Sequence, residues 1–296
     1  MRPIISQCPT PIYQLSKTIN TLIRPFLLNK YGLSSTSEFV DLIKGFPFRK
    51  GIVASLDVEN LFTNVPVTET IEFILECLYT PDMPSSVPIA RQVMSELLRL
   101  CTTEVPFTDP EGIMYVQVDG VAMGSPLGPT FAEFYMNLVE SRVFSDSSLK
   151  PPLYCRYVDD IFVLCDDTSH LERLRGRFEN CSVLYFTYEL SDVDKQLPFL
   201  DTLITQLDNR LQLSVYKKPS SSNETLNGAG YCPESYRRNV ILGYLHRAYL
   251  ITQDWADFHV EVQKIRTRLV DNNYSNSEID QQIRYFIDHK IKTSNH

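Results

Sequence analysis

The chain alternates short apolar runs with stretches in which apolar residues recur every three to four positions. The run 52–56 is apolar and partly β-branched, and it predicts a buried strand that delivers Asp57 at its end. Apolar residues at 71, 74, 75 and 78 then predict a helix that Thr68 would cap. A further helix is expected near 88–101. An acidic side chain therefore lies between a strand and a helix.

The middle of the chain predicts two hairpins. Residues 104–119 hold two β-like runs around the turn sequence Asp109-Pro110-Glu111-Gly112. The apolar runs 153–158 and 161–165 flank Asp159 and Asp160, and a two-residue connection at this acidic pair fits the length. Between the hairpins, the turn 124–129 leads into a long helix whose apolar residues recur on one face.

The rest of the chain completes an α+β pattern. A helix is expected near 168–180, strands near 183–189, 199–204 and 210–216, and a helical tail near 234–292. The order of strand, helices, hairpin, helix, strand pair, helix and strand predicts a split βαβ fold. Its crossover helices would cover one face of a small, mostly antiparallel sheet.

Composition and charge narrow the function classes. A length of 296 residues with 43% hydrophobic and 22% charged residues describes a folded protein with room for one large domain or two small ones. Seven cysteines without metal-ligand spacing indicate reduced thiols and argue against structural zinc. Neither a signal peptide nor an uncharged window of about 18 residues is present, so no membrane partner is expected.

The net charge of −8 is unevenly distributed. Residues 1–50 carry +5, residues 51–210 carry −15 and residues 211–296 carry +2. The acidic middle is either a solvated face or, in part, a set of carboxylates gathered for a metal ion.

The carboxylates at 57, 159 and 160 favour the second interpretation. If the strands that carry them pair, two or three carboxylates come within reach of one metal, and hard oxygen ligands suit Mg²⁺ or Mn²⁺. Two such ions can activate an attacking hydroxyl and stabilise a leaving phosphate oxygen. Either motif alone is more often a turn or a helix cap.

Four segments in order resemble reverse transcriptases. Tyr157-Val158-Asp159-Asp160 resembles their Tyr-x-Asp-Asp box, and residues 54–66 look like the first catalytic motif around Asp57. Residues 123–129 resemble the motif that positions dNTP and template. Residues 197–201 resemble the family's segment that comes after the helix following the Asp-Asp pair. Within this family the blocks 2–6, 55–58, 61–66, 199–201 and 215–219, with Arg247-Ala248, look most like Penelope-like retroelements.

The resemblance implies a right-hand polymerase palm with an antiparallel sheet and an Asp-Asp hairpin. It divides the chain into partial fingers (1–50), a palm (51–205) with a fingers insertion near 85–120, and a primer-grip hairpin with a helical, thumb-like region (206–296). The implied activity is RNA-directed DNA synthesis with two Mg²⁺ or Mn²⁺ ions. An RNA template, a DNA primer and dNTPs are the expected partners, with an intracellular and nuclear location.

The resemblance also assigns residues. Asp57, Asp159 and Asp160 would hold the metals, and Lys195 would protonate the departing pyrophosphate. Phe62 matches the aromatic gate that crowds a ribose 2′-OH, but by itself it would be an ordinary core residue. The remaining nucleotide contacts would come from Arg2, Gly124, Ser125, Pro126 and Tyr157, and the primer contacts from Tyr216, Lys217 and Lys218. The alternative is a frayed terminal residue for Arg2 and a solvent-exposed loop lysine for Lys195. For Tyr216, Lys217 and Lys218 it is an ordinary basic strand end.

Departures from the family leave other functions open. The match begins at Arg2, so we expect a preceding fingers strand to be missing, and the Gly-Ile-Tyr and Tyr-Ile-Gly pair of the associated nuclease is absent. The alternatives are an inactive remnant that binds RNA or DNA, and a folded product without function. RNA-directed RNA synthesis is disfavoured because Phe62 would exclude ribonucleotides.

Overall fold

The computed structural model describes residue 8 and residues 10–80, 87–103, 106–109, 111–117 and 119–294. The chain divides into two compact units, with unit 1 formed by residues 1–33 and 51–189 and unit 2 by residues 34–50 and 190–296. These limits differ from the expected boundaries after residues 50 and 205, since 34–50 packs with unit 2 and the second division falls near 190. The assignment of fingers, palm and thumb stays a prediction.

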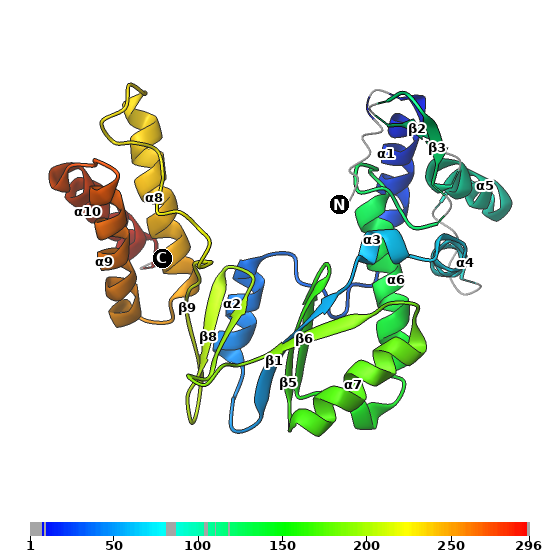
Figure 1. The fold of residues 1–296 in the computed structure, drawn as a ribbon, viewed down its shortest axis with the longest axis horizontal. Coiled ribbons are helices and arrows are strands. Elements are labelled where there is room, and N and C mark those ends of the chain that lie inside the picture. Colours follow the sequence, from blue (N-terminus) through cyan, green and yellow to red (C-terminus); the bar gives the residue numbers. More distant parts are fainter. Residues whose placement is uncertain are drawn as a thin grey trace. The chain divides into compact units, whose positions relative to one another are not determined.

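A four-stranded sheet forms the centre of unit 1 (Figure 1). Its order is β4-β5-β1-β6, and β5 pairs antiparallel with both β4 and β1. The strands are β1 (Ile52–Val58), β4 (Leu153–Tyr157), β5 (Asp160–Cys165) and β6 (Phe186–Leu190). Apolar side chains on β1, β4 and β5 are buried, as the sequence pattern predicts. The predicted α+β fold with an antiparallel sheet is confirmed.

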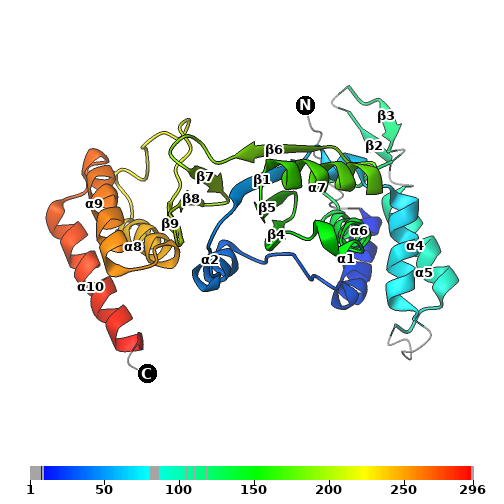
Figure 2. The same cartoon turned by 90° about the horizontal axis from the view of Figure 1, so that it is seen from below.

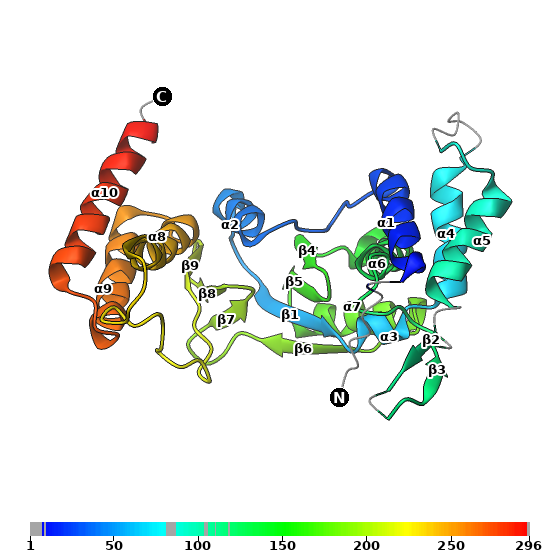
Figure 3. The same ribbon diagram turned by 90° about the horizontal axis from the view of Figure 1, so that it is seen from above.

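Helices pack around this sheet in one continuous core. They are α1 (Pro11–Ile23), η1 (Arg24–Phe26), α3 (Leu61–Asn64), α4 (Val67–Leu78), α5 (Arg91–Thr102), α6 (Gly128–Val143), η2 (Ser147–Leu149) and α7 (Thr168–Cys181). Figure 3 shows α4 and α5 side by side, next to α1. The capping prediction was wrong, because α4 begins after Pro66 and Thr68 lies inside the helix.

Helix α6 is buried on most sides. Its aromatic residues Phe131, Phe134 and Tyr135 are all less than 2% exposed. A helix that is apolar on most of its surface belongs in a core, so α6 acts as the support for its neighbours. Before α6 in the sequence, the expected hairpin is present and consists of β2 (Pro106–Thr108) and β3 (Met114–Val116).

Unit 2 combines helix α2 (Thr36–Gly45), a three-stranded antiparallel sheet and three C-terminal helices (Figure 2). The sheet contains β7 (Gln196–Phe199), β8 (Thr202–Gln206) and β9 (Leu211–Val215), and the helices are α8 (Glu234–Ile251), α9 (Trp255–Asp271) and α10 (Asn276–Ser294). The single strand expected at 199–204 was wrong, because the chain reverses between Phe199 and Thr202. No helix in the described residues is both long and apolar enough to cross a membrane.

Candidate active site and basic cavity

Two of the predicted aspartates lie opposite each other in the sheet of unit 1. Asp57 on β1 is the direct cross-strand partner of Asp160 on β5. Directly opposite residues of an antiparallel pair project from the same face, with their Cβ atoms about 5 Å apart. Asp159 precedes Asp160, and its carbonyl accepts a hydrogen bond from the Val58 amide at 3.2 Å. The strand order therefore gathers the three aspartates at one end of β1 and β5.

The hairpin that carries Asp159 turns one residue earlier than expected. Tyr157 pairs with Asp160, so the two-residue loop is Val158-Asp159 and not Asp159-Asp160. Val158 has a φ of 57°. This left-handed conformation is one that β-branched residues seldom adopt. Asp159 therefore sits in the loop, whereas Asp160 is the first residue of β5.

A buried ion network lies beneath this turn. Arg156 on β4 is 0% exposed, and its Nε donates to Glu140 Oε1 at 2.6 Å. Its Nη1 donates to Glu133 Oε2 at 3.1 Å and to the Val158 carbonyl at 3.0 Å. Burial alone would lower the pKa of Arg156, but the two glutamates outweigh this effect and raise it. Arg156 therefore stays charged inside the core.

The sequence reasoning missed Arg156. The available signal was a single charge in the otherwise apolar strand Leu153–Tyr157. A buried charge needs partners. Glu133 and Glu140 lie two turns apart on α6, so they supply both partners from one face of that helix.

The aspartates fit a divalent cation by their chemistry. Two carboxylates from neighbouring strands and one from the loop before β5 offer the hard oxygen ligands that Mg²⁺ and Mn²⁺ take. In the part of the chain that the structure describes, no three acidic, histidine or cysteine side chains converge closely enough to hold a metal ion. The assignment of a metal site to these aspartates therefore rests on their carboxylate chemistry and on the cross-strand pairing of Asp57 with Asp160.

The other predicted residues of unit 1 lie in two segments that contact each other. Phe62 on α3 is half-buried against the core, and its carbonyl accepts a hydrogen bond from the Val121 amide at 2.7 Å. Val121 leads into the turn that contains Gly124, Ser125 and Pro126. Ser125 is only 6% exposed, and its hydroxyl accepts from the Leu127 amide at 3.3 Å. Ser125 therefore shapes the turn that starts α6.

Tyr157, the last predicted nucleotide contact in unit 1, is 37% exposed at the end of β4. It is next to the Val158-Asp159 loop, so its ring is accessible beside the aspartates. Arg2 lies outside the described residues.

Lys195 and the predicted primer contacts belong to unit 2. Lys195 is exposed in the turn before β7, where its amide donates to the Asp192 carbonyl at 2.9 Å. Tyr216, Lys217 and Lys218 follow β9 directly and line a cavity of about 460 Å³. These three residues are consecutive in the chain, so the finding is that they share this cavity with residues of α8 and α9.

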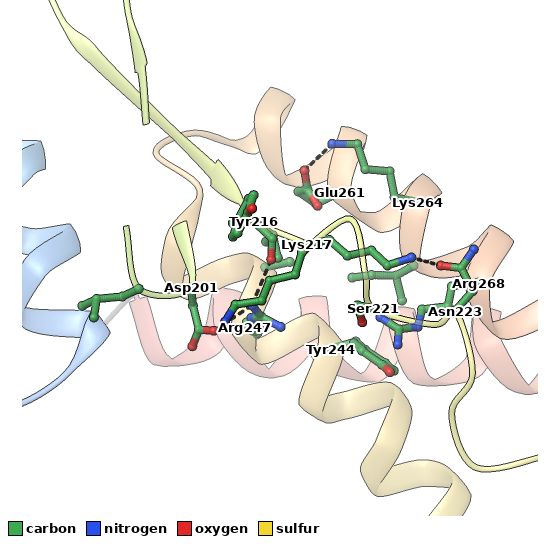
Figure 4. A pocket seen from close by; sticks show the side chains of 15 residues that line it. Asp201, Tyr216, Lys217, Ser221, Asn223, Tyr244, Arg247, Glu261, Lys264 and Arg268 are labelled. Atoms are coloured by element: carbon green, nitrogen blue, oxygen red, sulfur yellow. Dashed lines mark hydrogen bonds and ion pairs between the residues drawn. The ribbon is translucent and has the colours of Figure 1, made fainter. Parts of the chain in front are cut away.

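This cavity is rich in positive charge (Figure 4). Five of its lining residues are basic, namely Lys217, Lys218, Arg247, Lys264 and Arg268. Two are acidic, Asp201 and Glu261, and two are tyrosines, Tyr216 and Tyr244. The buried Nε atoms of Arg247 and Arg268 have no hydrogen-bond partner in the described residues. A cavity with a net positive lining suits an anionic group such as a phosphate.

Internal contacts fix some of these charges. Arg247 on α8 donates to Asp201 Oδ1 at 2.9 Å and to the Tyr216 carbonyl at 3.2 Å. Lys264 Nζ pairs with Glu261 at 2.6 Å, and the Arg268 guanidinium lies 4.8 Å from the centre of the Tyr244 ring. Lys217 bonds only to the neutral Asn223 in the described contacts, so its charge is not balanced by a carboxylate there.

Two family models match the chain. The family model described as reverse transcriptase (RNA-dependent DNA polymerase) matches residues 1–186, and an animal helix-turn-helix domain model matches residues 226–284. The second match covers α8, α9 and part of α10, and the sequence reasoning did not anticipate it. The search of curated proteins found no match.

Solved polymerase structures share the fold. Telomerase from Candida albicans, in complex with a TWJ fragment of telomeric RNA, is 11% identical with a TM-score of 0.60, covering 96% of this chain and 53% of that one. Apo telomerase from Candida tropicalis is 14% identical with a TM-score of 0.55, covering 94% and 51%. The RNA-dependent RNA polymerase of a human picobirnavirus is 11% identical with a TM-score of 0.53, covering 97% and 55%. The chain thus has a polymerase palm fold with C-terminal helices and spans about half the length of these structures.

Proposed function

The chain belongs to the reverse transcriptase family, and from this premise we propose that it is an RNA-directed DNA polymerase that extends a DNA primer on an RNA template. The observation that carries the proposal is the cross-strand pairing of Asp57 with Asp160, with Asp159 in the adjoining turn. Because of this pairing, the carboxylates of the two motifs that resemble reverse transcriptases, at 54–66 and 157–160, lie at the same end of one sheet.

The reaction is a nucleotidyl transfer. The oxygen of the primer 3′-OH attacks the α-phosphorus of a dNTP, a new P–O bond forms, and the bond to pyrophosphate breaks. Asp57, Asp159 and Asp160 would hold two divalent ions, which when bound favour loss of the hydroxyl proton and stabilise the leaving oxygen. The negative charge of the aspartates also disfavours direct approach of the triphosphate without cations.

Selection for deoxyribonucleotides would depend on Phe62. Phe62 is half-buried on α3, and the bond from the Val121 amide to its carbonyl links the first aspartate motif to the segment before α6. A rigid aromatic ring excludes a substrate that carries an extra hydroxyl more effectively than a mobile side chain does.

The basic cavity of unit 2 would bind the sugar-phosphate backbone of the primer or template. The exposed Lys217, which no carboxylate balances in the described contacts, and the neighbouring exposed Lys218 are donors of the kind that phosphate accepts. Phosphate contacts of this type position a strand without reading its sequence. The exposed Lys195 remains a candidate acid for pyrophosphate.

We also propose an origin in a Penelope-like retroelement and action in the nucleus. The support is the order of the blocks from 55–58 to 215–219.

Primer extension tests the function. Purified protein is incubated with a DNA primer on an RNA template, dNTPs and Mg²⁺ or Mn²⁺, beside Asp159→Asn and the control Asp208→Asn, which changes an exposed residue of the β8–β9 turn. We expect extension by wild type and Asp208→Asn and none by Asp159→Asn, with unchanged circular dichroism. Extension by Asp159→Asn would contradict the assignment.

The basic cavity supports one second candidate, an inactive protein that binds RNA–DNA hybrids. It predicts hybrid binding at 50 mM salt without extension by the folded wild type. Absence of binding at that salt concentration would exclude it.

A further inference from the structure

The turn that presents Asp159 is in an unfavourable backbone conformation. Val158, the first of its two central residues, has a φ of 57°. Hairpins with positive φ at this position ordinarily use glycine, because a side chain there is crowded by its own backbone. A valine stays in such a conformation only when the surroundings hold it there.

The Arg156 side chain supplies such a restraint. Its Nη1 donates to the Val158 carbonyl at 3.0 Å, and the same atom donates to Glu133 at 3.1 Å. The Arg156 backbone is fixed as well, because its amide donates to the Tyr31 carbonyl at 2.9 Å and its carbonyl accepts from the Leu33 amide at 2.7 Å. A fully buried, anchored guanidinium therefore holds the peptide that joins Val158 to Asp159.

The network also ties the turn to α6. Glu133 and Glu140 both lie on this helix, and Glu140 accepts from Arg156 Nε at 2.6 Å and from the Tyr154 hydroxyl at 2.8 Å. Helix α6 begins at Gly128, directly after the turn with Gly124, Ser125 and Pro126. One guanidinium thus fixes the distance between the aspartate turn and the helix that starts at the predicted nucleotide-positioning turn.

Stability alone is a poor reason for this arrangement. A buried ion network can often be replaced by apolar residues without loss of stability, since removing charges from water offsets their attraction. What such a network does provide is a fixed geometry through several directional hydrogen bonds.

We propose that Arg156 is a positioning residue that holds the Val158-Asp159 turn against α6 and so keeps Asp159 at the end of the sheet where Asp57 pairs with Asp160. The proposal rests on the proposed function for its effect on catalysis, but its effect on cation binding can be measured without any polymerase activity. Arg156 touches neither substrate nor metal and acts through the Val158 carbonyl.

The main test compares Arg156→Lys with Tyr154→Phe in the full chain. Lysine keeps the charge but cannot bond Glu133, Glu140 and the Val158 carbonyl in the planar arrangement of a guanidinium. Tyr154→Phe removes one hydrogen bond to the same Glu140 and leaves the bond to the turn intact. The readouts are Mn²⁺ affinity by electron paramagnetic resonance, thermal unfolding, and kcat and KM for dNTP.

We expect Arg156→Lys to weaken Mn²⁺ binding at least fivefold and to lower kcat at least tenfold, with KM for dNTP within about threefold. Tyr154→Phe should leave Mn²⁺ affinity and kcat within twofold, even where it lowers the unfolding temperature. Equal Mn²⁺ affinity in Arg156→Lys and wild type would overturn the proposal.

A rescue experiment separates positioning from general stability. Glycine accepts positive φ without strain, so Val158→Gly should let the turn form without the guanidinium. In the Arg156→Lys background it should recover at least half of the lost Mn²⁺ affinity. No recovery, with an unfolding temperature that shows a folded protein, would mean that Arg156 acts elsewhere.

A milder variant keeps the test decisive if Arg156→Lys fails to fold. Glu133 is 20% exposed and shares Nη1 of Arg156 with the Val158 carbonyl, so Glu133→Gln loosens the network from its edge. We expect a two- to fivefold loss of Mn²⁺ affinity that Val158→Gly reverses, and unchanged affinity would overturn the proposal. A wild type that binds Mn²⁺ but extends no primer would reject the proposed function and leave this positioning test intact.

Discussion

Val158 and Leu200 occupy equivalent positions in two different hairpins. Each is an apolar residue with positive φ, at 57° and 52°, and each precedes an aspartate that leads into a strand. In both cases an arginine bonds the turn, with Arg156 at the Val158 carbonyl and Arg247 at the Asp201 carboxylate. The two contacts differ in kind, because Arg156 bonds a backbone carbonyl of its turn, whereas Arg247 bonds an exposed side-chain carboxylate.

The buried thiol of Cys165 permits a chemical test of the sheet. Burial, together with the neighbouring Asp166 and Asp167 carboxylates, raises the pKa of Cys165 to about 12 from its ordinary value of 9.0. At pH 8 the thiolate should be about a thousandfold rarer than in an ordinary thiol. We expect iodoacetamide to label Cys165 at least 100-fold more slowly than the exposed Cys8 in the native protein, as read by peptide mass spectrometry.

The same shift has a consequence for stability. Because the pKa of Cys165 is higher in the folded protein, the unfolded chain loses this proton first as the pH increases. The part of the folding stability that depends on a neutral Cys165 thiol is therefore complete below about pH 9 and is lost between about pH 9 and pH 12.

Labelling of Cys165 should become as fast as that of Cys8 in 6 M guanidinium chloride. Equal rates in the native protein would show that β5 is not buried as described.

Phe62 provides a test of sugar selection. Phe62→Val should raise the use of ribonucleotides relative to deoxyribonucleotides by about tenfold, because a smaller side chain leaves room for a 2′-OH. Phe73→Val is the matched control, since Phe73 is also partly buried against the same core. Single-nucleotide extension with dCTP and CTP measures the ratio, and equal ratios in both variants would assign Phe62 to the core alone.

At the scale of elements, Gly120 connects two parts of the proposed nucleotide site. It has a φ of 74°, and a Cβ at this position would lie 2.5 Å from the Thr63 carbonyl oxygen next to Phe62. Gly112 has a φ of 85° but open space around its Cβ position. We expect Gly112→Ala to destabilise by about 1 kcal/mol from backbone strain alone and Gly120→Ala by about 2 kcal/mol or more. Urea unfolding measures both, and equal losses would argue against the contact between Thr63 and Gly120.

Helix α9 begins with a side-chain cap that can be removed. Asp254 accepts a hydrogen bond from the Asp257 amide at 2.8 Å. Asp254→Ala should destabilise unit 2 by about 1 kcal/mol. Asp271→Ala at the other end of α9 removes a carboxylate that the helix dipole disfavours, so it should be neutral or stabilise by about 0.3 kcal/mol. Helical circular dichroism during urea unfolding compares the two, and a neutral Asp254→Ala would contradict the cap.

The sequence predicts most elements and their order, but local signals could not set the turns or the long-range packing. The apolar runs on either side of Asp159 and Asp160 predict two paired strands, whereas the turn falls at Val158 because tertiary contacts override the turn preference of a β-branched residue. The run 199–204 looks continuous, but contacts from distant parts of the chain hold its reversal, namely the Tyr216 amide on the Asp201 carbonyl at 2.9 Å and Arg247 on the Asp201 carboxylate. The aspartate motif was predictable because its residues lie at strand ends, whereas the partners of Arg156 lie on a helix earlier in the chain.

At the scale of the whole chain, charge is divided between the two units. Residues of unit 1 sum to −9 and residues of unit 2 to +1, within the total of −8. The net negative charge of unit 1 produces an electrostatic potential that does not attract the phosphates of a nucleic acid. Association must then depend on local groups, and the basic cavity of unit 2 is the place where uncompensated cations are gathered.

This division of charge predicts that the affinity for an RNA–DNA hybrid falls only modestly as the salt concentration rises, and that a few lysines determine how steeply it falls. Each phosphate contact contributes about −0.9 to the slope of log K against log salt for a duplex. If Lys217 and Lys218 each meet a phosphate, Lys217→Ala/Lys218→Ala should reduce the slope for an RNA–DNA hybrid by about two. The control Lys17→Ala removes an exposed lysine from α1 in unit 1 and should leave the slope unchanged. Fluorescence anisotropy between 50 and 300 mM salt measures the slopes, and an unchanged slope in the double variant would place the backbone contacts outside the cavity.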